Sequence, residues 1–265
     1  MCLIVFAWRP ADARPLIVAA NRDEFYARPT APLAQWSDAP GVFAGRDLEA
    51  GGTWLGLGPN GRFAAVTNIR SGRAMPAMRS RGELCAAYLT GEQSLDAYAR
   101  AVCGRAREYA GFNLLLGDGR QLYYLNSESA VPEALAEGVY GLSNAALNTP
   151  WPKLLKARKA CSANLDNAPA GLFEALADPS QASEAELPET GVGIATERLL
   201  SSVFIASPSY GTRASTVVIA YADGRREMVE RSFGPGGGHL GEVAVEIAPE
   251  LRNAGLARLA ARFQG

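Results

Sequence analysis

The stretch Cys2-Leu3-Ile4-Val5-Phe6-Ala7-Trp8 is a continuous apolar run, and a second run, Pro15-Leu16-Ile17-Val18-Ala19-Ala20, follows it after a polar turn over residues 9–12. Continuous apolar runs of this length predict strands that are buried on both faces. Two such strands in succession indicate a sheet that is covered on both sides.

The position of Cys2 directly after the initiator Met1 bears on function as well as on fold. We expect Met1 to be removed in the cell, because the residue after it is small. Cys2 would then carry a nucleophilic thiol and an α-amine of pKa ~7.7–8.0, which is a base at neutral pH. Hydrolases with an N-terminal nucleophile are built in this way. The alternative is that Cys2 only begins a buried strand, because free cysteine is among the most buried residue types.

Composition bounds the classes of function. The length of 265 residues and the absence of a long Pro/Ser linker predict one domain, residues 1–265. The net charge of −1 gives no excess of positive charge that would attract nucleic acid or an anionic membrane. The first apolar run is too short to span a bilayer and lacks the flanks of a signal peptide. We therefore expect a cytoplasmic protein.

The cysteines and the histidine restrict the chemistry further. Cysteines stand at 2, 85, 103 and 161, a spacing that matches no zinc or CxxC pattern. The sole histidine, His239, excludes a site with several His ligands, and its Gly-rich flank predicts a surface loop. We expect no metal and no cofactor. A catalytic base has to come from elsewhere, and the α-amine of Cys2 would serve.

Shorter patterns predict the remaining elements. Residues 53–57 and 63–67 flank Asn60-Gly61, a strong hairpin signal. A polar segment punctuated by Pro and Gly, residues 178–193, predicts a surface loop. Helices are expected over 82–90, after the cap Ser94, after Pro152, over 171–177 and over 256–263, and strands over 112–116, 122–125, 139–142, 215–221, 226–232 and 243–247.

The order of these elements predicts the fold class. Strands, helices, strands, helices and strands follow one another, and hairpins dominate, so the sheets are expected to be mainly antiparallel. We predict an α+β protein built as a four-layer αββα sandwich, with two antiparallel sheets inside and helices outside. A generic α+β domain is the alternative that the same order permits.

Four polar residues, Asn21-Arg22-Asp23-Glu24, follow the second apolar run and predict the end of that strand. If the first two strands form a hairpin, this end lies close to Cys2. An arginine and a carboxylate there would hold the α-amine and the thiolate in place. The alternative is a solvated turn or a surface ion pair, which is common.

The same segment begins a series of motifs that resembles the NRDE family, also known as the Transport and Golgi organisation protein 2 family. The resemblance covers nearly the whole chain in order. It rests on Asn21 to Pro29, Gly51 to Gly56, Thr67-Asn68, Ser80-Arg81-Gly82, Gly111 to Leu114, Tyr140 to Asn144, Thr149-Pro150-Trp151, Tyr210 to Arg213 and Glu230-Arg231-Ser232. The family looks related to N-terminal nucleophile hydrolases of the penicillin acylase and bile-salt hydrolase type, which implies the αββα fold and hydrolysis of a linear amide.

The resemblance also implies site residues. The counterparts of the hydrolase nucleophile and its supporting groups are Cys2, Arg22, Asp23, Asn68, Asn144 and Arg213. The hydrolase pattern places its arginine and aspartate three residues apart, whereas Arg22 and Asp23 are adjacent, and Asn21 and Glu24 have that spacing instead. Adjacent side chains of a strand point to opposite faces. Which pair faces the thiol therefore stays open.

Each carried-over group has a chemical role and a simpler alternative. The amides of Asn68 and Asn144 would donate to a developing oxyanion, and losing one such donor typically costs ~3 kcal/mol of transition-state stabilisation. The alternative is a turn asparagine bonded to its own backbone. Arg213 would lower the thiol pKa or hold a substrate carboxylate, and its alternative is a surface arginine.

Two functional hypotheses follow. The first is a hydrolase of nonpeptide amide bonds in which Cys2 attacks a small-molecule substrate. The second, which the resemblance also implies, is a non-catalytic carrier for haem or for a lipid or acyl-CoA ligand. A haem ligand would be His239, Cys2, a methionine or a tyrosine.

Overall fold

The predicted first two strands lie side by side inside a six-stranded sheet of order β10-β1-β2-β11-β12-β13. The computed structural model describes residues 2–72 and 78–249. The strands of this sheet are β1 (Cys2–Trp8), β2 (Leu16–Phe25), β10 (Gly138–Leu142), β11 (Tyr210–Ala220), β12 (Arg226–Phe233) and β13 (His239–Ile247). All neighbours pair antiparallel. β1 is buried along its whole length, because side chains on both of its faces are covered.

The second sheet has seven strands in sequence order, each antiparallel to the next. They are β3 (Thr30–Gln35), β4 (Phe43–Asp47), β5 (Leu55–Leu57), β6 (Phe63–Asn68), β7 (Phe112–Gly117), β8 (Leu122–Asn126) and β9 (Pro132–Ala134). The expected hairpin joins β5 to β6. Asn60 and Gly61 at its tip have φ of 57° and 75°, a left-handed pair that Asn-Gly tolerates well.

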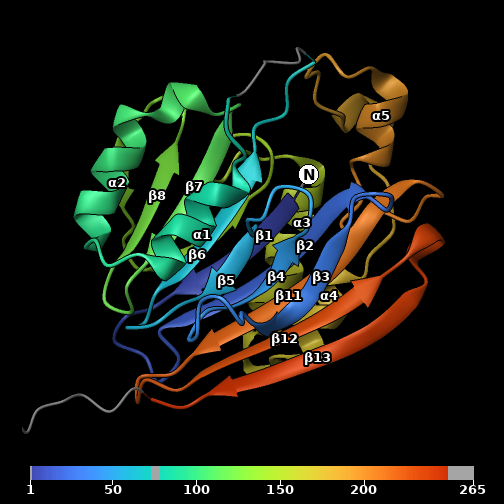
Figure 1. Ribbon diagram of the computed structural model, residues 1–265. Coiled ribbons are helices and arrows are strands. Elements are labelled where there is room, and N and C mark those ends of the chain that lie inside the picture. The colour runs from blue at the N-terminus through green and yellow to red at the C-terminus, as the bar shows by residue number, and fades with distance from the viewer. Residues whose placement is uncertain (1, 73–77, 250–265) are drawn as a thin grey trace, which may run out of the picture.

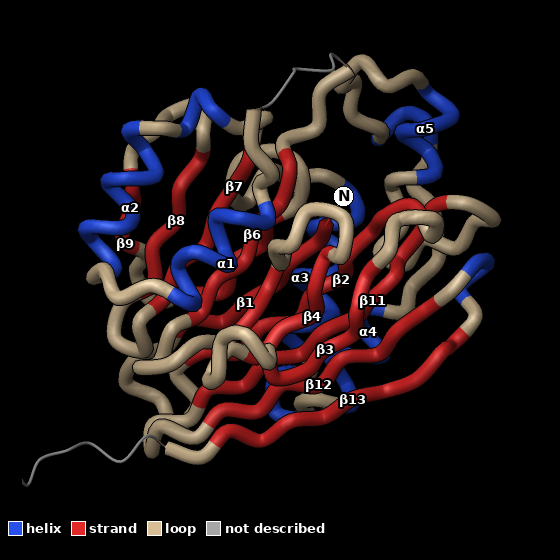
Figure 2. Tube along the Cα trace, in the orientation of Figure 1, coloured by secondary structure: helices blue, strands red, loops and turns tan. Residues whose placement is uncertain are grey.

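Helices cover the outer face of each sheet (Figures 1 and 2). The first pair, α1 (Gly82–Thr90) and α2 (Leu95–Gly104), packs on the seven-stranded sheet. The second pair, α3 (Pro152–Ala163) and α4 (Ala170–Leu176), packs on the six-stranded sheet. A shorter helix, α5 (Ile194–Leu199), stands at one end of the molecule. None of the helices in the described ranges is long and apolar enough to cross a membrane.

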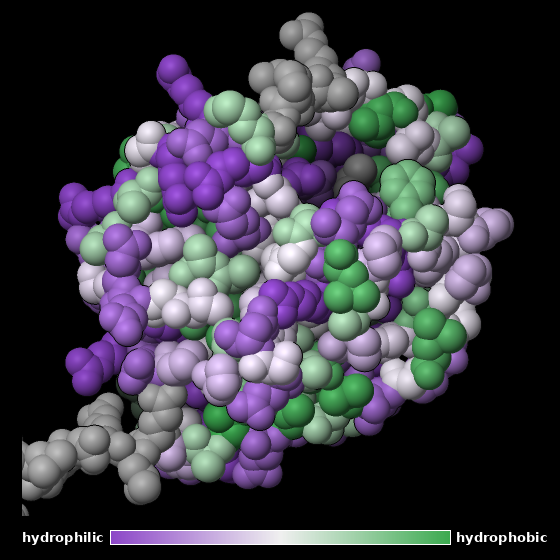
Figure 3. Space-filling view, in the orientation of Figure 1, coloured by the Kyte–Doolittle hydropathy of each residue, from purple (hydrophilic) through white to green (hydrophobic). Residues whose placement is uncertain are grey.

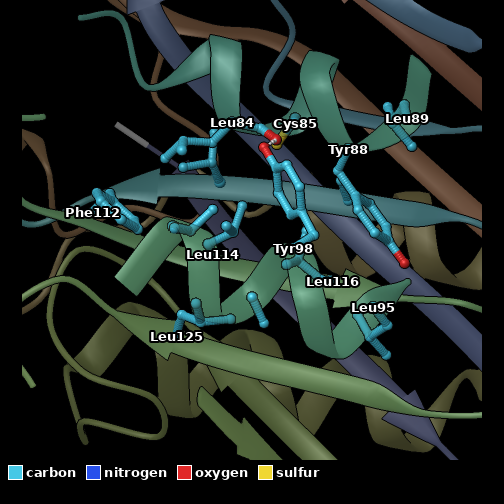
Figure 4. Packing of buried hydrophobic residues seen from close by; sticks show 14 of the residues in the cluster. Leu84, Cys85, Tyr88, Leu89, Leu95, Tyr98, Phe112, Leu114, Leu116 and Leu125 are labelled. Carbon is cyan, nitrogen blue, oxygen red and sulfur yellow. Dashed lines mark hydrogen bonds between the residues drawn. The ribbon is translucent and has the colours of Figure 1, made fainter. Parts of the chain in front are cut away.

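Three apolar clusters separate the four layers. Leu84 and Tyr88 of α1 and Tyr98 of α2 pack with Leu114 and Leu116 of β7 beneath the first helix pair (Figure 4). The two strands β1 and β2 supply both other clusters, because their side chains alternate between faces. Facing the second sheet are Ile4, Phe6, Trp8, Leu16, Val18 and Ala20, and facing α3 and α4 are Leu3, Val5, Ala7, Ile17 and Ala19. The predicted αββα sandwich is confirmed.

Some element boundaries differ from the prediction. The second strand does not end at Ala20 but continues through the four polar residues to Phe25, because β1 and β11 pair with it on both sides. The strands β3, β4 and β9 and the helix α5 were not predicted. His239 does not lie in a loop; it begins β13, where it is exposed as expected. The helix predicted over residues 256–263 lies outside the described residues.

Candidate active site

Cys2 begins β1 and borders a cavity of about 550 Å³ between the two sheets. The cavity exists because the row of residues that continues from Cys2 across the sheet becomes small. Arg22 of β2 is opposite Cys2, and the next positions are Ala214, Ser232 and Gly241. All five line the cavity, whose other wall comes from β3, β4, the residues before β5, β6 and the start of α1. On the face shown in Figure 3, hydrophilic side chains gather around the start of β1.

The environment of the Cys2 thiol favours its protonated form. The residue is 7% exposed, and burial raises the pKa of the thiol above its ordinary value. The nearby carboxylates of Asp23 and Glu24 raise this pKa further, while the guanidinium of Arg22 lowers it. A buried neutral thiol needs a base before it can attack a carbonyl group.

The path of β2 shows which polar side chains share the face of Cys2. Arg22 and Glu24 occupy alternate positions on the face that turns toward the second sheet, and Arg22 Nη2 lies 3.9 Å from Glu24 Oε2. Asn21 and Asp23 occupy the opposite face. Neither of the two pairs that the spacing suggested therefore faces the thiol as a pair; Arg22 and Glu24 do.

Asn21 has a structural role on the helix-facing side. Its Nδ2 donates to the carbonyl oxygens of Leu176 and Val203, both at 2.9 Å. Its Oδ1 accepts from Ser215 Oγ at 2.6 Å. These bonds satisfy the buried amide and tie β2 to the end of α4, so Asn21 is not available to a ligand in the cavity.

Asp23 lies in a buried polar pocket beneath α3. Its Oδ1 accepts from Thr212 Oγ1 at 2.9 Å, and its Oδ2 lies 4.0 Å from Lys153 Nζ. Burial raises the pKa of Asp23, and the ammonium of Lys153 opposes that shift. Burial likewise lowers the pKa of Lys153 to about 8, which Asp23 opposes. Asp23 directly follows Arg22, the residue of β2 that pairs with Cys2.

The two predicted asparagines lie together but differ in access. Asn144 Nδ2 donates to both Oδ1 and the backbone oxygen of Asn68, each at 3.0 Å. Asn68 lines the cavity and Asn144 is 1% exposed behind it. Ser143, next in sequence, donates to the backbone oxygen of Cys2 at 3.3 Å. Asn144 thus orients the amide of Asn68, and Asn68 faces the cavity.

Arg213 lines the cavity from a β-bulge. The register of β11 against β2 shifts between Thr212 and Ala214, which leaves Arg213 as the extra residue. Its Nη1 donates to the backbone oxygens of Phe25 at 3.0 Å and Tyr26 at 3.2 Å, and also to that of Arg28. Arg213 therefore fixes the turn after β2 as well as facing the cavity.

Several buried charged residues on this side of the molecule were not predicted from the sequence. Lys153 follows Pro152 at the start of a helix, and nothing in the sequence distinguishes it from a surface lysine. Arg70 and Glu197 form an ion pair of 2.5 Å with side chains only 2% and 3% exposed. Arg81, which borders the cavity, belongs to the Ser80-Arg81-Gly82 motif, so a signal for this residue existed.

In residues 2–72 and 78–249, no three His, Cys, Asp or Glu side chains are grouped so that they could hold a metal ion. His239 does not line the cavity beside Cys2; it packs against the ring of Phe233 at 5.9 Å and is exposed.

Comparison with known proteins shows the family of this chain. The family model described as Transport and Golgi organisation 2 matches residues 1–235. This chain belongs to that family. It is 36% identical to the Transport and Golgi organization protein 2 homologs of Bos taurus and Homo sapiens, in each case over 257 residues that cover 88% of this chain and 93% of the relative.

A solved structure relates the family member to a wider fold. The chain is similar to a mutant of conjugated bile acid hydrolase from Clostridium perfringens, with a TM-score of 0.50 over 94% of this chain and 95% of that one. The sequence identity is 8%, so the likeness shows the fold alone. That fold is of the N-terminal nucleophile hydrolase type, with Cys2 at its N-terminal region.

Proposed function

We propose that this protein is an N-terminal cysteine nucleophile hydrolase that cleaves a linear, nonpeptide amide bond in a small molecule. The observation that supports the proposal most strongly is the position of Cys2. It begins a strand inside the six-stranded sheet and borders a cavity of about 550 Å³, with Arg22 beside it on β2. A cysteine that only filled a core would border packed side chains instead of a cavity.

The proposed reaction uses groups at the start of β1. Removal of Met1 frees the α-amine of Cys2, which takes the thiol proton as the sulfur attacks the amide carbonyl carbon. The amine then gives this proton to the leaving nitrogen, the C–N bond breaks, and an acyl thioester forms on the sulfur. Water attacks the thioester, which releases the acid and restores the thiol.

Asp23 is suited to hold the α-amine. It directly follows Arg22, which pairs with Cys2, and its carboxylate is fixed by Thr212 and Lys153. A neighbouring carboxylate favours the protonated amine, and a neighbouring ammonium opposes it. Together, Asp23 and Lys153 would act on the proton affinity of the amine in opposite directions.

Asn68 is suited to stabilise the tetrahedral oxyanion. Its amide borders the cavity, and Asn144 fixes its orientation through two hydrogen bonds of 3.0 Å. Loss of one oxyanion donor lowers kcat by about a hundredfold to a thousandfold in enzymes of this kind. We expect Asn68→Ala to show a decrease of that size without a matching rise in KM.

The test combines mass spectrometry with turnover. Intact mass of the cell-made protein is measured for loss of Met1, and the protein is then incubated with N-decanoyl-4-nitroanilide and N-decanoylethanolamine. We expect Met1 to be absent, a decanoyl adduct on the Cys2 peptide, and no release of amine by Cys2→Ala. Cys103→Ala is the matched control, because Cys103 is half-buried on α2 away from the cavity.

Retention of Met1 together with unchanged turnover in Cys2→Ala would contradict the hydrolase proposal. The carrier hypothesis makes a different prediction. A carrier would release no product from wild type or from Cys2→Ala. It would bind a lipid or an acyl-CoA in both proteins alike, and haem likewise unless Cys2 itself ligates the iron.

A further inference from the structure

The cavity beside Cys2 contains more positive charge than its acids neutralise. Arginine residues line it at positions 22, 28, 46, 81 and 213, and acidic residues line it at positions 23, 24, 47, 230 and 242, of which Asp23 turns its side chain to the other face of β2. These numbers are equal, but several of the acids face away from the arginines or are already bound. Whether a guanidinium group is left without a counter-charge depends on the partner of each group.

Two of the arginines are neutralised by their own carboxylates. Arg28 donates through Nε and Nη2 to Asp47 Oδ2, at 3.0 and 2.7 Å. Arg46 makes a two-pronged contact with Asp38, at 2.6 and 2.8 Å. Neither guanidinium needs a further anion.

Two of the acids have cationic partners outside this set of arginines. Asp23 is turned to Thr212 and Lys153, as described above, and Glu242 accepts from Arg231 at 2.7 Å. Glu230 and Glu24 accept hydrogen bonds from uncharged groups, such as the backbone N–H of Leu33 at 2.7 Å and that of Phe25 at 2.9 Å. These two carboxylates therefore remain for three arginines, Arg22, Arg81 and Arg213.

Arg22 and Arg81 are the guanidinium groups with donors to spare. Within residues 2–72 and 78–249, the nearest carboxylate of Arg22 is that of Glu24 at 3.9 Å, too long for a hydrogen bond, and the Arg22 side chain is only 12% exposed. Arg81 Nη1 donates to the uncharged backbone oxygen of Gly111 at 3.2 Å. Arg22 is opposite Cys2 in the β1–β2 pair, and Arg81 lines the same cavity.

The backbone around Arg81 holds this residue at the cavity. Thr53 N–H donates to the Gly82 backbone oxygen at 3.1 Å, so the loop before β5 lies against the start of α1. A Cβ on Gly52 would lie 2.4 Å from the Gly82 carbonyl carbon, which explains a glycine at position 52. This close approach fixes the residue before α1 beside the cavity.

We propose that Arg22 and Arg81 form an anion subsite next to Cys2, and that the ligand is an amide with a carboxylate or phosphate group close to the scissile bond. A desolvated guanidinium is costly without an anion, and its planar donors match both oxygen groups bidentately. The assignment of the anion to a substrate rests on the proposed hydrolase function. The subsite itself does not, since any anion of this kind would occupy it.

Alkylation of Cys2 tests the subsite without turnover. Iodoacetate and iodoacetamide react in the same way: the sulfur bonds to the methylene carbon, iodide leaves, and the thiol proton goes to solvent. They differ in charge, so the ratio of their rates at Cys2, followed by peptide mass spectrometry, cancels effects of the thiol pKa. We expect the iodoacetate-to-iodoacetamide ratio to be about tenfold higher at Cys2 than for N-acetylcysteine.

Variants locate the effect. Arg22→Gln and Arg81→Gln should each lower the ratio at least threefold, while Arg46→Gln, which removes a cavity arginine already bound to Asp38, should leave it unchanged. Circular dichroism checks that each variant is folded. Protection of Cys2 from iodoacetamide by acetate or by inorganic phosphate then distinguishes a carboxylate site from a phosphate site.

A ratio at Cys2 equal to that of N-acetylcysteine, or one that neither Gln variant changes, would overturn the subsite. Failure of the hydrolase proposal has a different signature, because an inactive protein can still show the raised ratio. Conversely, an active hydrolase with an ordinary ratio would retain the proposed reaction and lose the anion subsite.

Discussion

At the scale of single residues, the Asp23–Lys153 pair is the most unusual feature near Cys2. Both side chains are almost fully buried, at 0% and 2% exposed, and their charged atoms are 4.0 Å apart. Lys153 Nζ has no hydrogen-bond partner among the described residues. Burial of such a pair costs more free energy than a packed apolar pair would, so its retention fits a role at the N-terminus better than a role in stability.

The lowered pKa of Lys153 predicts a pH dependence of stability. Folding lowers this pKa from 10.5 to about 8, so between those pH values the unfolded chain binds the proton more tightly than the native protein. Stability attributable to Lys153 therefore rises as pH rises through this window, by about 3 kcal/mol at most. Urea denaturation of wild type and Lys153→Met from pH 7 to 10.5 should show the rise in wild type and its loss in the variant.

A double-mutant cycle gives the control for this pair. Lys153→Met leaves the Asp23 carboxylate buried beside an apolar side chain and should cost about 3 kcal/mol at pH 7. Adding Asp23→Asn removes that charge, so the double variant should be less destabilised than the sum of the single variants. Strict additivity would show that the two groups do not interact.

At the scale of elements, α5 is held to the rest of the molecule by buried charge. Glu197 of α5 accepts from Arg70 at 2.5 Å and from the Thr190 N–H at 3.0 Å. The guanidinium of Arg70 lies 4.5 Å from the ring of Trp151, which precedes α3, and the Arg70 N–H donates to the Asn144 backbone oxygen. One arginine thus joins α5, the start of α3 and the asparagine that orients Asn68.

Breaking this ion pair should destabilise the protein strongly. Glu197→Gln leaves a buried guanidinium without its carboxylate, and we expect a loss of about 3–5 kcal/mol in the free energy of unfolding, measured in urea. Amide hydrogen exchange should quicken first in α5. Arg198→Gln is the matched control on the same helix, since the pair of Arg198 with Glu184 is 46% and 65% exposed and should contribute less than about 1 kcal/mol. Equal losses in both variants would contradict the assignment.

The helices and strands that were predicted from the sequence differ physically from those that were not. β1, β7 and α2 carry long apolar patterns or a cap such as Ser94, whose side chain accepts from the Ala97 N–H as expected. β3 contains Pro32 and is largely exposed, and α5 has six residues held mainly by Glu197, so neither shows a periodic apolar pattern. Tertiary pairing, which a local pattern does not contain, forms both.

The same distinction applies to the candidate site. The position of Cys2 and the motif around Arg22 were evident from the sequence. The faces of β2 were not, because the prediction ended that strand at Ala20, and alternation along the continued strand separates Arg22 from Asp23. Lys153 comes from α3 in the adjacent helical layer, so its proximity to Asp23 is a consequence of packing that no local pattern predicts.

At the scale of the whole molecule, polar bonds join the two sheets across the interior. Glu230 of β12 accepts from the N–H of Leu33 on β3, at 2.7 Å. Arg226 Nη1 donates to the Gly58 backbone oxygen at 2.5 Å, and Thr67 Oγ1 donates to the Ser143 oxygen at 2.6 Å. The Glu230 and Thr67 bonds lie where the sheets part around the cavity, whereas the Arg226 bond joins the sheets at the other end of β12. The cavity walls are therefore held by directional contacts as well as by apolar packing.

Because Glu230 is part of the cavity wall and can ionise, it should make the stability of the protein depend on pH. Burial raises its pKa above 4.5, and the hydrogen bonds from Leu33 and Thr216 only partly oppose this. A raised native pKa means that the contribution of Glu230 to stability is full below pH 4.5 and is lost as pH rises through the native value. Glu230→Gln keeps the acceptor for Leu33 and cannot ionise, so its stability relative to wild type should increase from pH 4 to pH 8. Urea midpoints across that range measure the difference.

Glu242→Gln, on the half-exposed Arg231–Glu242 pair, is the control, and its stability should change with pH in parallel with that of wild type. If the curve of Glu230→Gln were also parallel to that of wild type, the buried carboxyl group would not titrate differently in the folded protein.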